Sequence, residues 1–234
     1  MTKSVSIPAR FNGPPASGNG GYCCGVLAGF IDGVARVRLH TPPPLEREME
    51  IRRDGDGAVG MYDGDLRVGS AWHGELNLDV PVAPGIAEAE AAEQGYRFRN
   101  DHVFPTCFVC GPGRPEKDGL ELFPGPVSDW EMLACTWRPS PDLLDEKGCV
   151  CPEFVWSALD CPGFYAAYGE DPQLAVLGEL TGEILQPVPG SDPLVVYAWP
   201  LGREGRKAYG GAAVASADGT VLAVSHSTWI ELKP

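Results

Sequence analysis

Residues 19–39 read NGGYCCGVLAGFIDGVARVRL. Small and apolar residues from Tyr22 to Phe30 predict a short helix that opens at Asn19-Gly20-Gly21. Asp32-Gly33 is expected to end it, because glycine commonly terminates helices. Ala35 to Leu39 then alternates apolar and polar residues, which is the period of a half-buried strand. The stretch therefore predicts a helix followed closely by a strand.

The same order of elements occurs twice along the chain. In the first half, the proline run 42–44 separates the first strand from strands expected around Met49 and over Leu66 to Leu78, the latter after an Asp63-Gly64 turn. In the second half, Pro152 fits the first turn of a helix that we expect to run to Tyr168. Further strands are expected over 174–185, 194–199, 207–216 and 221–232. A repeated order of this kind indicates a duplicated α+β unit.

The repeat divides the chain into three segments. Residues 1–79 are expected to form the first unit and residues 104–234 the second. Residues 80–103 are expected to form a linker, because 80–94 is rich in proline and alanine, with room for one helical turn.

Charge and hydropathy exclude several classes of function. The formal net charge of −14 argues against general binding to nucleic acid, since phosphate attraction needs a basic surface. No apolar run approaches the roughly 20 residues that cross a bilayer. The first residues also lack a hydrophobic segment of the signal-peptide type. We therefore expect a soluble cytoplasmic protein without membrane insertion.

Three motifs carry a resemblance to hotdog-fold thioesterases. Cys107-Phe108-Val109-Cys110-Gly111-Pro112, with Gly119-Leu120 nine residues after Cys110, is similar to the opening of many small bacterial acyl- and aryl-CoA thioesterase domains. Trp156-Ser157-Ala158-Leu159-Asp160 resembles their central helix, which carries an acidic residue partway along. Asn19-Gly20-Gly21-Tyr22 resembles the first helix start of double-hotdog acyl-CoA thioesterases. The resemblance implies a double hotdog, that is, two fused units that each wrap a central helix in an antiparallel sheet.

The resemblance also implies where a site lies, because hotdog pairs build their active site between two units. Thioester hydrolysis needs a group that activates water or attacks the carbonyl, and donors for the developing oxyanion. We assign to Asp160 the role of the group that activates water or attacks the carbonyl. We assign the role of oxyanion donor to the free N–H groups after Gly20 and Gly21, at a helix N-terminus where the dipole favours negative charge, and we count Asn19 among the catalytic residues. Tyr22 and Trp156 are expected to contact the substrate.

The sequence departs from the family at one position. The small thioesterases usually open the catalytic helix with His-Gly-Gly, whereas Cys151-Pro152-Glu153 stands there in this chain. Proline has no N–H to donate. The symmetry-related site, with Pro152 and Glu153 facing Asp32, is therefore expected to be vestigial.

Structural explanations exist for the same residues. Asp160 could cap a kink, since Cys161-Pro162 follows and proline disfavours helical geometry in the residue before it. Asn19 could simply be the N-cap of a tight turn.

Arg203, Arg206 and Lys207 form the densest basic cluster of this acidic chain. They fall between two predicted strands, where hotdog thioesterases often hold the nucleotide end of coenzyme A, and arginine binds phosphate in a bidentate manner. A solvated hairpin tip is the alternative.

The eight cysteines are read as reduced thiols, in keeping with a cytoplasmic protein. Cys107-x-x-Cys110-Gly has zinc-knuckle spacing, and Cys149-x-Cys151 could supply a second pair. Because C-x-C spacing is uncommon in zinc ribbons and the resemblance explains Cys107 and Cys110 without metal, we expect no metal. Cys161 is expected to be a buried packing residue.

The sequence thus predicts an acyl-CoA or acyl-carrier thioesterase that needs no cofactor beyond the coenzyme A of its substrate. A non-catalytic acyl-thioester or lipid-binding protein is the first alternative, because His-Gly-Gly is missing. A hotdog hydratase or dehydratase is the second, but it needs a paired Asp and His that we do not find. Hotdog units often associate further, so a homo-oligomer of such chains is compatible with the sequence.

Overall fold

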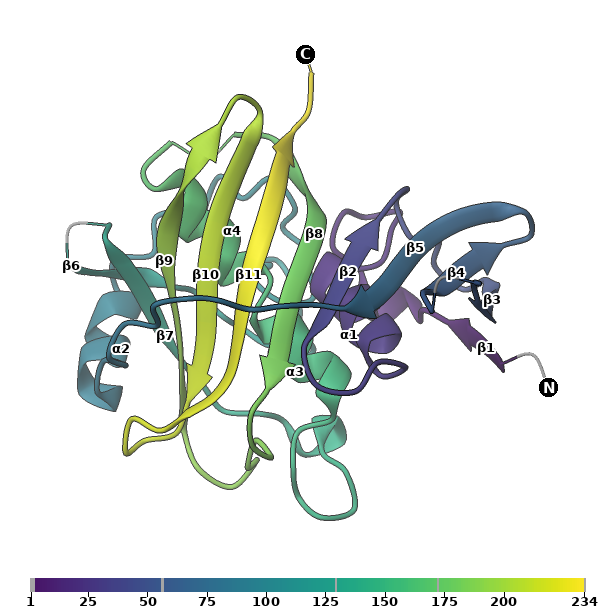
Figure 1. Cartoon of the computed structure of the whole chain (residues 1–234). Coiled ribbons are helices and arrows are strands. Elements are labelled where there is room, and N and C mark those ends of the chain that lie inside the picture. Colours follow the sequence, from purple (N-terminus) through teal and green to yellow (C-terminus); the bar gives the residue numbers. More distant parts are fainter. Residues whose placement is uncertain (1–2, 56, 129, 172, 234) are drawn as a thin grey trace.

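The computed structural model describes residues 3–55, 57–128, 130–171 and 173–233. Within these residues the strands form one antiparallel sheet in the order β1-β3-β4-β5-β2-β8-β11-β10-β9-β7-β6. Figure 1 shows α1, α3 and α4 on one side of this sheet and the N-terminal strands at one end of it. Each half of the chain thus wraps its helices with its own strands, and the two sets of strands share a single sheet.

The first half contributes the strands at one end of the sheet. Its helix α1 spans Gly20–Ala28, with Asn19 as N-cap accepting the N–H of Tyr22 at 2.9 Å. Its other elements are β1 (Lys3–Ser6), a 3₁₀ turn η1 (Ala9–Phe11), β2 (Ala35–Leu39), β3 (Glu48–Arg53), β4 (Val59–Asp63) and β5 (Leu66–His73). In β2, Ala35 and Val37 are buried, Leu39 is partly buried and the arginines are exposed, as the alternation predicts.

The second half contributes the remaining strands and two consecutive helices. The helices are α3 (Pro152–Ala158) and α4 (Cys161–Tyr168). The other elements are β6 (Gly125–Ser128), β7 (Met132–Trp137), η2 (Pro141–Leu143), β8 (Ala175–Ile184), β9 (Leu194–Glu204), β10 (Lys207–Ala215) and β11 (Val221–Glu231). The helix expected from Pro152 to Tyr168 is therefore interrupted at Asp160. Pro162 lies in the first turn of α4, and a proline there cannot continue the preceding helix.

The two halves join where β2 pairs with β8, with Ala35 opposite Gly182 and Arg38 opposite Glu179. The helices also meet, because α1 packs directly on α3. Two glycines of α1 make this contact possible. A Cβ added at Gly21 would lie 2.6 Å from the Trp156 carbonyl oxygen, and one added at Gly25 would lie 2.6 Å from Cα of Glu153. Only glycine allows this close approach. The two helices run antiparallel, so Asp160 lies near the start of α1.

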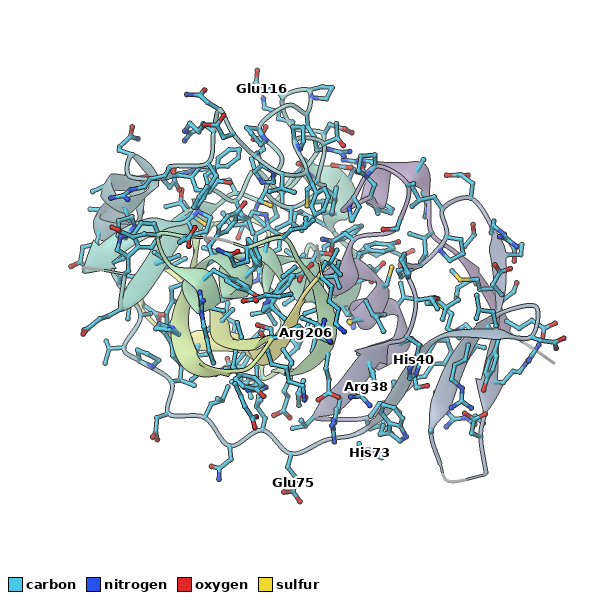
Figure 2. The ribbon with its side chains drawn as sticks, turned by 90° about the horizontal axis from the view of Figure 1, so that it is seen from above. Arg38, His40, His73, Glu75, Glu116 and Arg206 are labelled. Carbon is cyan, nitrogen blue, oxygen red and sulfur yellow. The ribbon has the colours of Figure 1, made fainter. Side chains whose placement is uncertain are left out.

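The segment between the halves is not a free tether. After β5 the chain crosses the sheet face opposite the helices, from β5 toward β7 (Figure 1). Leu76 and Leu78 pack there against the outer cluster around Tyr197, whose hydroxyl donates to the Pro81 carbonyl at 3.1 Å. Residues 80–103, expected as a linker, contain helix α2 (Ile86–Glu93), which packs on β6 and β7. Glu75 on this crossing and Glu116 on the loop after the Cys107–Cys110 turn lie at opposite edges of the molecule in Figure 2.

Differences from the predicted strands have local causes. The strand expected over Leu66 to Leu78 stops at His73, because the chain leaves the sheet to make this crossing. The strand expected to end at Trp199 continues to Glu204 through a register shift opposite Tyr209 and Gly210. The sequence did not predict β1, β6 and β7, of which β1 and β6 are short edge strands.

Candidate active site

The carboxyl of Asp160 lies between the two units. Its residue is 2% exposed, and its Oδ2 accepts two hydrogen bonds from the first unit, from Asn19 Nδ2 and from the Gly21 amide, both at 2.9 Å. Asp160 occupies the N-cap position of α4, but its side chain makes no capping hydrogen bond there. The chain does break at this residue, as the structural explanation expects, yet the carboxyl is directed to the other unit rather than to its own helix.

The second carboxyl oxygen differs from the first in its hydrogen bonding. Oδ1 of Asp160 is buried and has no hydrogen-bond partner among the described residues. Burial raises the pKa of Asp160 to about 7, and the charge of Cys107 adds to this rise, while the hydrogen bonds from Gly21 and Asn19 oppose it. This carboxyl titrates near neutrality, and one of its oxygens accepts hydrogen bonds while the other has no partner among the described residues. These are the properties expected of a general base.

Asp160 forms part of a cavity wall. This cavity, which we call the Asp160 cavity, is bounded by the loop 13–20, the start of β8 and Trp229. Asn19 and Gly20 line it together with Asp160. Gly20 is the first residue of α1, and its N–H has no hydrogen-bond partner within the described residues. Residues of both units therefore meet at one hollow, as the resemblance implies.

A second hollow adjoins it, and we call it the apolar cavity. Its wall is mostly apolar and includes Phe98, Phe164 and Leu174. The two cavities share Phe104, Cys107, Cys161, Ala175 and Trp229. A polar end next to Asp160 and an apolar extension suit a ligand with a reactive carbonyl and a hydrocarbon or aromatic tail.

The structure changes the role expected for Gly21. Its N–H was expected to be free for a thioester oxygen, but it is already donated to Asp160. The N–H groups that follow are also occupied, since Tyr22 donates to the Asn19 side chain and Cys23 to the Asn19 carbonyl. Gly21 thus positions the carboxyl, and Gly20 is the amide that remains for an oxyanion.

Tyr22 and Trp156, expected to contact substrate, do not line either cavity. The ring of Tyr22 stacks on Phe11 with centroids 4.4 Å apart, and Trp156 is buried against Gly25 and Gly182. Both are core residues because α1 and α3 present these faces to each other. The residues of the expected vestigial site are likewise outside both cavities; they are Pro152, Glu153 and Asp32.

The basic cluster lies at the β9–β10 hairpin, as predicted, and does not line the two cavities. Arg203 donates from Nε to the Ala167 carbonyl at 3.1 Å and from Nη2 to the Tyr168 carbonyl at 3.0 Å. It therefore caps the C-terminus of α4. Arg206, labelled in Figure 2, donates to the Glu231 carbonyl at 3.0 Å. Both guanidinium groups thus have structural partners.

Sequence reasoning missed the group that surrounds Cys161. The Sγ atoms of Cys107, Cys110 and Cys161 all lie within 4.8 Å of one another, beside His102 and Tyr165. The sequence shows the close spacing of Cys107 and Cys110, but no sequence motif connects these two residues with Cys161. Only the packing of their turn on the start of α4 unites the three.

Comparisons with known proteins agree with the architecture. No family model matches the sequence, and no curated protein matches it. Among solved structures, the acyl-CoA thioesterase II TesB2 of Mycobacterium marinum aligns with a TM-score of 0.63 at 10% identity, over 99% of this chain and 93% of that one. The tesB protein of Mycobacterium avium subs paratuberculosis aligns at 0.60 and 12%, over 98% and 92%.

A conserved protein of unknown function with a hot dog fold from Alicyclobacillus acidocaldarius aligns with a TM-score of 0.62 at 12% identity, over 100% of this chain and 96% of that one. At these identities the likeness concerns the fold. Among the helices of the described residues, none is long and apolar enough to cross a membrane. The chain has the α+β double-hotdog fold, with both units in one continuous sheet.

Proposed function

We propose that this chain hydrolyses an acyl thioester in the Asp160 cavity, with Asp160 as the general base. The observation that carries the proposal is the state of its carboxyl. One oxygen accepts hydrogen bonds from Asn19 and Gly21 of the other unit, the other is buried without a partner among the described residues, and Asp160 lines the cavity. The structural similarity to the protein of Mycobacterium marinum that is named acyl-CoA thioesterase II TesB2 supports the same chemistry.

In the proposed reaction a water molecule lies between Asp160 Oδ1 and the thioester carbonyl carbon. Asp160 removes a proton from the water as the oxygen bonds to that carbon. The carbonyl oxygen becomes an oxyanion beside the Gly20 N–H. The oxyanion then collapses, the C–S bond breaks, and the departing thiolate takes the proton from Asp160. The products are a carboxylic acid and a thiol, and the carboxylate of Asp160 is regenerated.

We propose coenzyme A as the thiol carrier and the β9–β10 hairpin as the place that binds its phosphates. Lys207 is exposed there. Arginine has five N–H donors, so Arg203 and Arg206 retain donors beyond those given to backbone carbonyls. Arg206→Ala with Lys207→Ala is expected to weaken coenzyme A binding and to reduce its dependence on salt. Binding that ignores salt and survives both changes would reject this location.

Thioester hydrolysis is tested by incubating the protein with a panel of acyl-CoAs and a thiol-detecting dye. We expect thiol release from at least one acyl-CoA by the wild type and none above background from Asp160→Asn. Full activity of Asp160→Asn would remove Asp160 from the mechanism.

A non-catalytic acyl-thioester-binding protein is the second candidate, and one observation favours it. The Gly21 amide that a substrate oxygen would use is bound to Asp160 instead. Tight binding of an acyl-CoA, measured by calorimetry, without thiol release from any member of the panel would favour this candidate over hydrolysis.

A further inference from the structure

Three buried thiols converge where the two cavities meet. Cys107 and Cys110 belong to one tight turn, and Cys161 is the first residue of α4. The Sγ atoms of Cys107 and Cys161 are 3.7 Å apart, and those of all three residues lie within 4.8 Å of one another. Two thiolates on a tetrahedral zinc ion, with Zn–S bonds of about 2.3 Å, lie about 3.8 Å apart. The thiols thus already have almost the spacing that a single ion imposes.

The turn itself is arranged around the sulfur of Cys107. The backbone N–H groups of Val109 and Cys110 donate to this sulfur, and the Gly111 N–H donates to the Cys107 carbonyl at 2.9 Å. A Cβ at Gly111 would lie 2.5 Å from the Cys107 nitrogen, so only glycine closes the turn. Amide donors directed at a cysteine sulfur stabilise the thiolate form, which is the form that binds metal.

Further donors surround the group. Asn19 Nδ2 lies 4.0 Å from the Cys107 sulfur. His102 Nε2 and the Tyr165 hydroxyl lie 3.3 Å and 3.6 Å from the Cys110 sulfur. His102 Nδ1 accepts the Phe104 N–H at 3.0 Å, so in the neutral ring Nε2 carries the hydrogen and donates. His102 therefore supports a thiolate through a hydrogen bond and is not itself a ligand.

From this arrangement we propose that Cys107, Cys110 and Cys161 bind one Zn²⁺ as three thiolates. Soft sulfur ligands select zinc over magnesium or calcium. Binding releases the thiol protons to solvent and changes no oxidation state. All three residues line the apolar cavity, so the fourth position of the ion faces that cavity and takes a water molecule. The site ties the Cys107–Cys110 turn to the start of α4, next to Asp160.

The proposal departs from the expectation that this chain binds no metal, and its ligands differ from those that the sequence suggested. Cys149 and Cys151, the pair that the sequence offered to complete a four-thiolate site, are not part of the group. Cys161, expected to be a packing residue, takes their place.

The proposal extends beyond thioester hydrolysis, and its test does not measure hydrolysis. The full chain is produced in zinc-supplemented medium, purified under reducing conditions without chelator, and analysed for metal by mass spectrometry. We expect equimolar zinc in the wild type and in Cys135→Ser, which changes a buried thiol of β7 outside the group. Cys161→Ser is expected to lose about tenfold or more in zinc affinity, measured by competition with a chromophoric chelator.

Cobalt provides a measurement that needs no variant. Replacement of zinc by Co²⁺ in the wild type is expected to give intense thiolate-to-cobalt absorption and the visible bands of a tetrahedral ion. The proposal is wrong if the wild type takes up neither zinc nor cobalt, if Cys161→Ser binds zinc as tightly as Cys135→Ser, or if two of the three thiols are recovered as a disulfide. Asp160→Asn should keep its zinc, so loss of hydrolysis and loss of metal are distinguished.

Discussion

Gly21 donates its backbone N–H to Oδ2 of Asp160 at 2.9 Å, across the contact between α1 and α3. The donor comes from the first unit and the acceptor from the second. This bond and the one from Asn19 hold Oδ2 of a buried carboxyl, whereas Oδ1 has no hydrogen-bond partner among the described residues.

Hydrolysis should follow the ionisation of Asp160. Its pKa is raised to about 7 by burial, so the carboxylate that acts as base is lost as pH falls below neutrality. We expect kcat/KM of the wild type to rise with pH and to level off above the midpoint. A stopped-flow profile of thiol release that stays flat between pH 5 and 9, as expected for a carboxyl with an ordinary pKa of about 4, would contradict this environment for Asp160.

Asp160→Asn should stabilise the fold at neutral and higher pH. The folded-state pKa of Asp160 lies above its ordinary value of 3.8, so its charge is disfavoured in the native state. The wild type therefore loses stability as pH rises from 3.8 to about 7. Asparagine can accept the same two bonds without the charge, and the advantage could reach about 4 kcal/mol above pH 7. Urea unfolding of both proteins at pH 5 and 8 measures the difference in their free energies of unfolding. The same difference at the two pH values would contradict a raised pKa of Asp160.

Asn19→Asp should shift the activity midpoint upward. Aspartate can still accept the Tyr22 N–H as N-cap, but it removes the Nδ2 donor and brings a like charge to Asp160. We expect the midpoint to rise by about one pH unit or more. Asn77→Asp, on the exposed crossing segment, is the control that should leave the midpoint unchanged. A downward shift in Asn19→Asp would show that the two carboxyls do not interact as described.

Gly21→Ala should separate α1 from α3. Its Cβ would lie 2.5 Å from Cβ of Asp160 and 2.6 Å from the Trp156 carbonyl, so backbone must move, at a cost of about 2 kcal/mol or more. Gly29→Ala is the matched control, because its nearest neighbour would be 3.5 Å away and its φ is −60°. We expect it to change stability by about 0.5 kcal/mol at most. Thermal unfolding of both variants measures the difference, and equal effects would place the close helix contact elsewhere.

Arg203→Ala should lower stability, because Arg203 caps α4 through the carbonyls of Ala167 and Tyr168. Since the side chain is partly exposed, we expect a loss of about 1 kcal/mol. Lys207→Ala, at the same hairpin, is expected to leave the urea midpoint unchanged. A destabilisation by Lys207→Ala that equals that of Arg203→Ala would argue against the capping role.

The sequence by itself determined the local elements and their repetition. The alternation of Ala35 to Leu39 and the N-cap Asn19 set β2 and the start of α1, because strand period and capping depend on neighbours along the chain. The motif around Trp156 to Asp160 indicated the double hotdog and drew attention to Asp160. Pro162 already marked the place where the second helix breaks.

Tertiary structure decided which groups meet. The Gly21 amide is bound to Asp160, Arg203 caps α4, and Cys161 joins Cys107 and Cys110. Each of these contacts links residues more than thirty positions apart in the chain, and sequence patterns report only near neighbours. The raised pKa of Asp160 has the same origin, because burial depends on how the two units close over the carboxyl.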